Sequence, residues 1–182
     1  MRQYVLLILV AMATLVPALA DAAEAGPVEV VTAIYRRAAA GKGDSGGDFL
    51  WLRAQDRRLN FTWRTAELWD RADRATPKGD QGAPEFDPVT ASQDPFLQKF
   101  ALATEEVTPD QARILVRLFG YDRKEAYASV RYHFARADDR WLIDDISGST
   151  DGRAWSIRDI LQEHLASYAK QRGRASRGGA RR

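Results

Sequence analysis

A short coil in the middle of the chain holds the first side chains that could do chemistry. Residues 85–96 contain two Asp-Pro steps and three polar side chains close together, Asp87, Gln93 and Asp94. A carboxylate in a pocket can act as a general base. Asp side chains also bond to nearby backbone N–H groups in turns. Two interpretations are therefore open for this coil, a ligand or catalytic site and plain turn structure.

A second set of polar residues lies in segments with strand-like patterns. Asp144 and Asp145 are adjacent, so in a regular strand they point to opposite faces. At most one of them then meets a basic side chain, and the candidates are Arg113, Arg131 and His133. A cross-strand ion pair for one aspartate and solvent for the other is one interpretation. The alternative is that the paired aspartate and its cation hold a ligand.

Histidine and cysteine usage limits the chemistry further. The chain has two His and no Cys, which excludes disulfides, thiol nucleophiles and thiolate metal sites. Two His give no recognisable zinc spacing, and we expect His164 to be a core residue of a helix. No phosphate-binding loop, dinucleotide fingerprint or nucleophile elbow is present. The sequence thus predicts no metal and no cofactor.

The elements that must position these residues are four strands between positions 100 and 146. In residues 111–119, apolar and polar side chains alternate as in a half-buried strand. Short turns at 108–110, 122–124 and 137–139 favour antiparallel neighbours. One face of the second and third strands is apolar and consists of Ala112, Ile114, Val116, Leu118, Ala126, Ala128, Val130, Tyr132 and Phe134. The other face mixes Arg, Tyr, His and Phe and is a candidate binding surface.

We expect helices both before and after these strands in the sequence. Pro27 is suited to the first position of a helix that stops at Gly41, before a flexible loop at 41–48. A second helical region covers about 49–75 and is broken near Leu59 and Asn60. Residues 147–153 are expected to form a loop. A capping box at 156–159 then starts a final helix, which we expect to end near Gln171.

The N-terminus has the features of a secretory signal peptide. Arg2 precedes an apolar run at 4–16, and Ala18 and Ala20 form an Ala-x-Ala cleavage site. We predict a signal peptide at 1–20, with cleavage after Ala20 or, as a second option, Ala25. The run is too short to span a bilayer comfortably, which disfavours a membrane anchor. An exported protein without Cys points to a bacterial periplasm or the medium.

The charge of the chain is unevenly distributed. Residues 170–182 carry one Lys and five Arg, and removing this +6 and the +1 of Arg2 from the net +2 leaves −5 for residues 21–169. We expect one domain at 27–171 and a basic, disordered tail at 172–182. Either the tail is simply solvated, or it contacts anionic lipid headgroups or acidic polymers of the envelope. Because export removes the protein from nucleic acid, we expect no nucleic-acid partner.

The order of these elements carries a resemblance to a known fold. The motifs are Asp87-Pro88, Gln93-Asp94 and the closing Trp141-Leu142-Ile143-Asp144-Asp145-Ile146. With the helix and strand order of residues 27–146, they resemble the nuclear transport factor two-like (cystatin-like) cone fold. More narrowly, they resemble a family of exported bacterial domains of unknown function with that fold. The resemblance implies an α+β domain whose helices close one side of a curved sheet and leave a pocket.

Two classes of function follow from this sequence. The leading hypothesis is a binding module that takes a small molecule in the cone or a protein partner at its rim, in an immunity or inhibitor role. The alternative is an isomerase or lyase, in which Asp87 or Asp94 would be the base and Tyr127 or Tyr132 the hydrogen-bond donor. The mixed sheet face could also form a homodimer interface.

Overall fold

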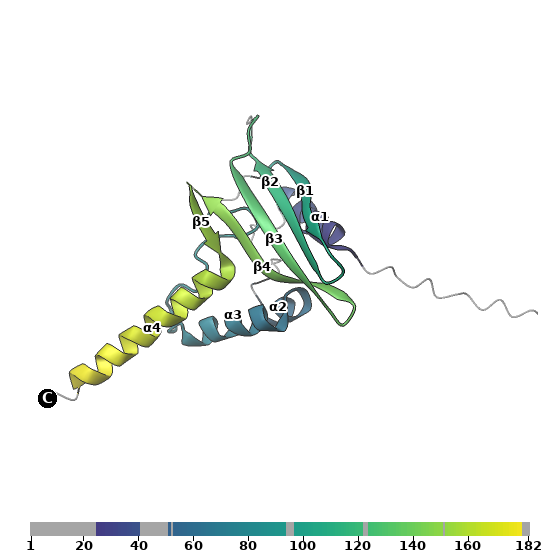
Figure 1. Cartoon of the computed structure of the whole chain (residues 1–182). Coiled ribbons are helices and arrows are strands. Elements are labelled where there is room, and N and C mark those ends of the chain that lie inside the picture. Colours follow the sequence, from purple (N-terminus) through teal and green to yellow (C-terminus); the bar gives the residue numbers. More distant parts are fainter. Residues whose placement is uncertain are drawn as a thin grey trace, which may run out of the picture.

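The computed structural model describes residues 25–40, 51, 53–93, 97–121, 124–150 and 152–179, except for the side chains of 150 and 174–179. Within these ranges the chain forms three helices, a five-stranded sheet and a long final helix (Figure 1). The predicted α+β class with an antiparallel sheet is confirmed. The predicted signal peptide and the loop at 41–48 lie outside the described residues.

The sheet is an antiparallel meander in which the strands follow one another in sequence order. Its strands are β1 (Lys99–Val107), β2 (Gln111–Phe119), β3 (Ala128–Ala137), β4 (Arg140–Thr150) and β5 (Arg153–Ser156). The prediction of four strands is wrong by one, because β4 continues through the expected loop and pairs with β5. Gly152 allows the reversal between them with a φ of +76°, a conformation open to glycine.

The predicted faces of the sheet are confirmed. The apolar residues of β2 and β3 are buried, and those named are Ala112, Ile114, Val116, Leu118, Ala128, Val130, Tyr132 and Phe134. The turn between β3 and β4 also forms as predicted, with positive φ angles of 50° and 59° at Asp138 and Asp139. Two such residues give a hairpin turn whose twist matches that of the strands.

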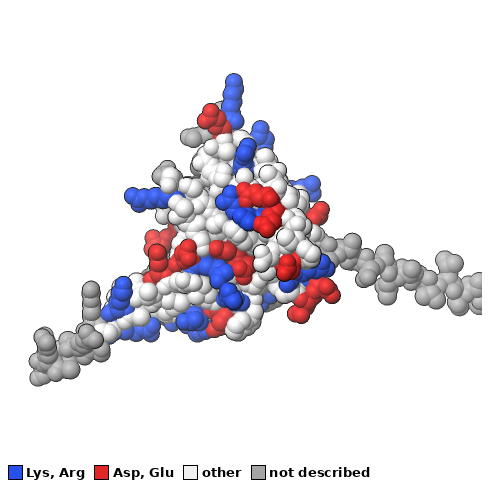
Figure 2. All heavy atoms as spheres, viewed as in Figure 1, with Lys and Arg blue, Asp and Glu red and all other residues white. Residues whose placement is uncertain are grey.

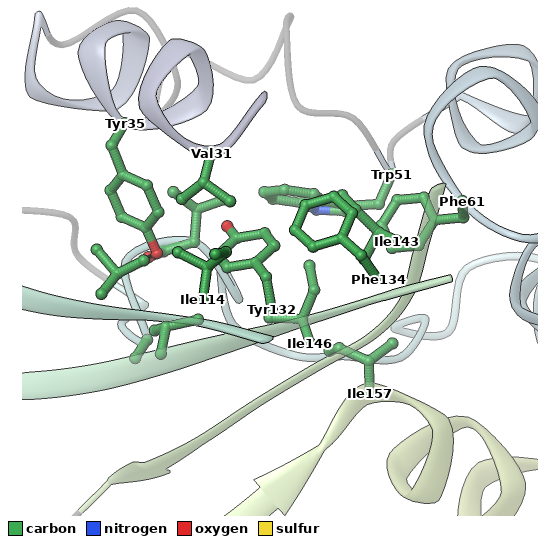
Figure 3. Close-up of a cluster of buried hydrophobic side chains, with 14 of the residues drawn as sticks. Val31, Tyr35, Trp51, Phe61, Ile114, Tyr132, Phe134, Ile143, Ile146 and Ile157 are labelled. Atoms are coloured by element: carbon green, nitrogen blue, oxygen red, sulfur yellow. Dashed lines mark hydrogen bonds between the residues drawn. The ribbon is translucent and has the colours of Figure 1, made fainter. Parts of the chain in front are cut away.

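Helices pack on the apolar face of this sheet. Helix α1 (Pro27–Ala39) buries Val31 and Tyr35 against it, as Figure 3 shows. The predicted break in the second helical region is confirmed, since α2 (Ala54–Asn60) and α3 (Trp63–Ala75) are separate helices. Between them, Phe61 is buried and bridges to Ile143 of β4. The corner between α2 and α3 therefore contacts the sheet at strand β4.

The final helix, α4 (Ile157–Gly179), starts as predicted but continues further. The hydroxyl oxygen of Ser156 accepts a hydrogen bond from the Asp159 N–H at 3.2 Å, as in a capping box. The end predicted near Gln171 is wrong, and residues 172–179 are helical rather than disordered. No Pro interrupts the segment, although Gly173, Gly178 and Gly179 are poor helix formers. Positions 180–182 lie outside the described residues.

Gly148 of β4 provides a test of the unexpected β4–β5 pairing. A Cβ atom at Gly148 would lie 2.5 Å from Cζ2 of Trp155 and 2.8 Å from the Ser129 carbonyl oxygen. We expect Gly148→Ala to lower the free energy of unfolding by roughly 1–3 kcal/mol, measured by urea denaturation, because the strand and the indole ring must move.

The matched control is Gly173→Ala in α4, where an added Cβ meets no atom within 4 Å. It should be neutral or stabilise by up to about 1 kcal/mol, since alanine favours helix. Wild-type stability for Gly148→Ala would contradict the close packing of Trp155 on β4.

Candidate functional site

A pocket of about 660 Å³ opens beside α3 and the coil that precedes the sheet. We call it the mouth pocket, and its lining residues are Trp51, Arg57, Trp69, Asp73, Gln81, Gly82, Ala83, Pro84, Glu85, Phe86, Asp87 and Gln93. Two predicted site residues, Asp87 and Gln93, belong to this pocket. The third, Asp94, lies outside the described residues.

Arg57 is a buried cation in the wall of the mouth pocket, with 4% of its surface exposed. Its Nη2 donates to Asp70 at 2.8 Å and to Asp73 at 2.6 Å, while Nη1 donates to the Trp51 carbonyl at 2.6 Å. The guanidinium also lies over the ring of Trp69, 5.7 Å from its centroid. Such a charge is tolerated in a core only when its donors are paired. The network therefore fixes the position of both tryptophans.

The pKa of Asp70 shows that Asp70 and Arg57 are strongly coupled. Burial alone would raise the pKa of Asp70, but hydrogen bonds from Arg57 and Arg58 outweigh it and lower the pKa below the usual value. The Asp70 carboxylate thus stays charged next to Arg57. This pair was not predicted from the sequence, because residues 49–75 contain six Arg and three Asp and no spacing distinguishes Arg57 and Asp70 from the others.

The Asp87 carboxylate bonds to nearby backbone in a turn, which was one of the two interpretations of this coil. Its carboxylate accepts hydrogen bonds from the Val89 N–H at 2.9 Å and from the Thr90 N–H at 3.3 Å. The Thr90 hydroxyl donates to it at 2.6 Å. Gln93 donates to the backbone carbonyl of Glu85 at 3.3 Å. These contacts hold the coil in the shape that forms one wall of the mouth pocket.

Three tyrosines surround the inner side of the same coil. Tyr35 donates to the Val89 carbonyl at 2.7 Å, and Tyr127 donates to the Thr90 carbonyl at 3.1 Å. The buried Tyr132 hydroxyl meets no acceptor or donor with full hydrogen-bond geometry among the described residues, but it lies close enough to the Tyr35 hydroxyl for the two to affect each other's pKa. Burial, together with the negative charge of Asp87, raises the pKa of Tyr127 to about 12. Burial also raises the pKa of Tyr132, so these hydroxyls stay protonated.

Asp144 and Asp145 do not lie in a regular strand, and the prediction of opposite faces is wrong. His133 pairs with Asp145, but the next residue of β3 pairs with Ile143, so β4 bulges by one residue. Ile143 and Ile146 are both buried as a result. A β-bulge places two residues opposite one and redirects their side chains. Both aspartates therefore reach the start of α4, a partner that sequence analysis did not predict.

The two carboxylates join the sheet to the helices. Asp144 accepts from Nη1 of Arg158 at 2.8 Å and from the hydroxyl of Thr62, just before α3, at 2.9 Å. Asp145 accepts from the Ser156 hydroxyl at 2.7 Å and from the Arg158 N–H at 3.2 Å. Burial raises the pKa of Asp145, and these hydrogen bonds partly offset the effect. Their observed role is to hold helix ends.

The predicted cations of the outer sheet face pair with glutamates of β1. Arg131 makes two hydrogen bonds to Glu105, at 2.6 and 2.7 Å, and Arg113 pairs with Glu106. The hydrogen bonds from Arg131 hold the pKa of Glu105 below its usual value. In Figure 2, positive and negative side chains are interspersed on the face in view rather than separated into large patches. This face is therefore largely compensated in charge.

His133 borders a smaller cavity on that face, of about 170 Å³, together with Glu106, Gln111, Arg113 and Asp144. Its Nε2 lies 2.9 Å from the Ser147 hydroxyl oxygen. Burial lowers the pKa of His133, and Arg113 and Arg131 add to this, whereas Asp145 opposes it. The other histidine, His164, is half-buried with its Nε2 2.7 Å from the Thr76 hydroxyl oxygen.

No cluster of three or more His, Cys, Asp or Glu side chains that could hold a metal ion occurs in the described part of the chain. None of the helices described is long and apolar enough to cross a membrane. Comparisons with protein-family models, curated proteins and solved structures find no match for this chain. The function must therefore be argued from the geometry of these sites.

The lowered pKa of His133 gives a prediction for stability against pH. The folded protein favours neutral imidazole, so this residue stabilises the fold above its unfolded pKa and that contribution is lost as the pH falls through the folded value. Urea denaturation between about pH 7.5 and pH 5 should show a smaller loss of stability for His133→Gln than for the wild-type protein. Parallel losses in the two proteins would contradict the burial argument.

Proposed function

We propose that this chain is an exported binding module that holds a small organic ligand in the mouth pocket. The observation that carries this proposal is a pocket of about 660 Å³ with aromatic walls and a few polar groups. Ligand sites in proteins have volumes of this order and this mixture of apolar walls and convergent polar groups. Several lining residues are already held by hydrogen bonds without a ligand, which lowers the entropic cost of binding.

The lining indicates the chemistry of the ligand. Trp51, Trp69 and Phe86 line the pocket. The two tryptophans expose only small parts of their rings, 6% and 2% of their surface, and Phe86 is held by an edge-to-face contact with Trp155 at 5.0 Å. Arg57 is the cation of the lining and is already bound to Asp70 and Asp73. The carboxylates of the lining outnumber this cation, because Glu85 and Asp87 also belong to it. A flat apolar ligand with a positively charged amine is therefore favoured.

The contacts around the coil support binding more than catalysis. An isomerase would use Asp87 or Asp94 as the base and Tyr127 or Tyr132 as the donor, and of the two aspartates Asp94 lies outside the described residues. Asp87 instead accepts hydrogen bonds from two backbone N–H groups and a hydroxyl, and Tyr127 donates to the backbone. These groups stabilise the pocket wall. The buried hydroxyl of Tyr132, which lies beside that of Tyr35, is the feature that favours the isomerase alternative.

The cone fold is part of the same proposal. Helix α1 lies on the apolar face of the antiparallel sheet, as expected for a nuclear transport factor two-like domain (Figure 1). Strand β5 and the long helix α4 come in addition to that pattern. Export through the N-terminal segment is proposed on its sequence pattern. A protein partner at the rim, or a second copy on the outer sheet face, is the alternative to a small ligand.

A matched pair of small probes tests the chemistry of the pocket. Phenethylamine and phenylacetate have the same ring and opposite charges. We expect phenethylamine to bind more tightly, measured by intrinsic Trp fluorescence, since Trp51 and Trp69 line the pocket. Glu85→Gln should weaken phenethylamine binding about twofold to fivefold, the range for a partly exposed charge pair.

The control for this experiment is Glu125→Gln, which removes an exposed carboxylate that is not part of the pocket lining. It should leave the affinity unchanged. Equal affinity for the two probes, or no binding of either, would contradict the proposed ligand chemistry.

A further inference from the structure

The corner between α2 and α3 exposes large apolar side chains. Trp63, the first residue of α3, is 79% exposed, and Leu59, near the end of α2, is 52% exposed. A single exposed apolar residue is ordinary, whereas adjacent ones can mark an interaction site. Tryptophan is also enriched where proteins meet the headgroup region of a membrane.

Cations accompany these apolar side chains along α3. Arg64 and Arg71 are exposed, and neither has an ion-pair partner among the described residues. The neighbouring Arg74 is paired with Glu67, which compensates both charges. The outer side of α3 therefore carries net positive charge next to Trp63, although the body of the chain as a whole is acidic.

Helix α4 adds further positive charge at a distance from the acidic body. Its last described contact with the body is the Tyr168 hydroxyl, which donates to Asp80 at 3.1 Å, and residues 169–173 are all exposed. Lys170, Arg172, Arg174 and Arg177 follow on the helix. From Tyr168 to the helix end is roughly 16 Å at the α-helical rise. This exceeds the Debye length of about 8 Å at physiological salt, so the acidic body is largely screened from the helix end.

These features lie on one side of the molecule. In Figure 1 the α2–α3 corner, α3 and the free part of α4 all lie along the lower edge, whereas the turn after β2, which follows Tyr121, lies at the top. Figure 2 shows several Lys and Arg side chains, with some Asp and Glu between them, along that lower edge. We call the surface formed by Leu59, Trp63, Arg64, Arg71, Lys170 and Arg172 the basic edge.

We propose that the basic edge docks on a lipid bilayer with anionic headgroups. Its cations would pair with headgroup phosphates, and Trp63 and Leu59 would enter the headgroup region. Each basic residue near an anionic leaflet strengthens binding by about fivefold. Residues 169–182 contain only Ala among the apolar types, so α4 would lie on the surface and not insert. This inference is independent of the mouth pocket and its ligand.

Vesicle co-sedimentation tests the proposal. Every variant is expressed with its own N-terminal segment. Its mass is then determined, so that variants with the same N-terminal processing are compared. We expect binding to phosphatidylcholine vesicles that contain one third phosphatidylglycerol, and far weaker binding to phosphatidylcholine alone. Binding should weaken at least tenfold when salt rises from about 0.05 to about 0.5 M.

Variants of exposed residues test the cationic and the apolar side chains of the basic edge separately. Arg64→Gln with Arg71→Gln should weaken binding about 25-fold, from two factors of about five. Trp63→Ala should weaken it about fivefold to tenfold through loss of interfacial apolar contact. Tyr121→Ala and Arg117→Gln remove an exposed aromatic and an exposed cation elsewhere, and both should bind as the wild-type protein does. Circular dichroism checks that each variant is folded.

Three outcomes would overturn the proposal. They are equal binding to neutral and anionic vesicles, no binding to either, and equal losses in the basic-edge and control variants. Heparin serves as a polyanion without a bilayer. If Trp63→Ala weakens binding to heparin and to vesicles alike, the tryptophan does not enter a bilayer and the assignment to lipid fails.

Discussion

The buried Arg57 is the interaction on which the packing of α2 on α3 depends. Its hydrogen bonds connect α2 to Asp70 and Asp73 of α3 and to the carbonyl of Trp51. Removing one partner of a buried ion pair leaves an unpaired charge, at a cost of roughly 3–5 kcal/mol. Three separate stretches of chain are therefore tied to one guanidinium. The same guanidinium lines the mouth pocket, so the pocket walls are part of the stability of the fold.

The bulge in β4 connects the sheet to two helices, as Arg57 connects α2 to α3. It turns Asp144 and Asp145 toward the beginnings of α3 and α4, where their acceptors meet Thr62, Ser156 and Arg158. Carboxylates near helix N-termini are favoured by the helix dipole and by the free N–H groups there. The sheet thus orients both helices, and α4 leaves the body in a defined direction with its basic residues beyond the last contact.

Much of the framework could be predicted from local patterns. Alternation in β2 and β3 identified the buried face, and Pro27 and Ser156 marked two helix starts correctly. Alternation presupposes a regular strand, which is why it misplaced Asp144 and Asp145. The Ser- and Gly-containing end of β4 has too little apolar periodicity to predict β5. The Arg57–Asp70 pair depends on tertiary contact over 13 positions, so its spacing has no helical or strand period.

Only some residues of the candidate site could be predicted from local sequence patterns. Asp87 and Gln93 were recognised because polar residues beside Pro are prominent in a sequence, and they do line the mouth pocket. The aromatic residues of the wall were not recognised as a site, since burial and pocket lining have the same sequence pattern. Arg113, Arg131 and His133 share the outer face as predicted, but their partners are glutamates of β1 and Ser147.

Native mass spectrometry of the purified protein tests the central claim, that the mouth pocket holds a ligand, most directly. Gly82 lines the pocket, and an added Cβ there meets no atom within 4 Å, so a Gly82→Trp side chain can be attached without a clash at Cβ, and we expect it to compete with a ligand. The account predicts a small bound mass on the wild-type protein, lost at low activation energy, and none on Gly82→Trp at unchanged thermal stability. An empty wild-type protein, or equal occupancy of both proteins, would contradict it.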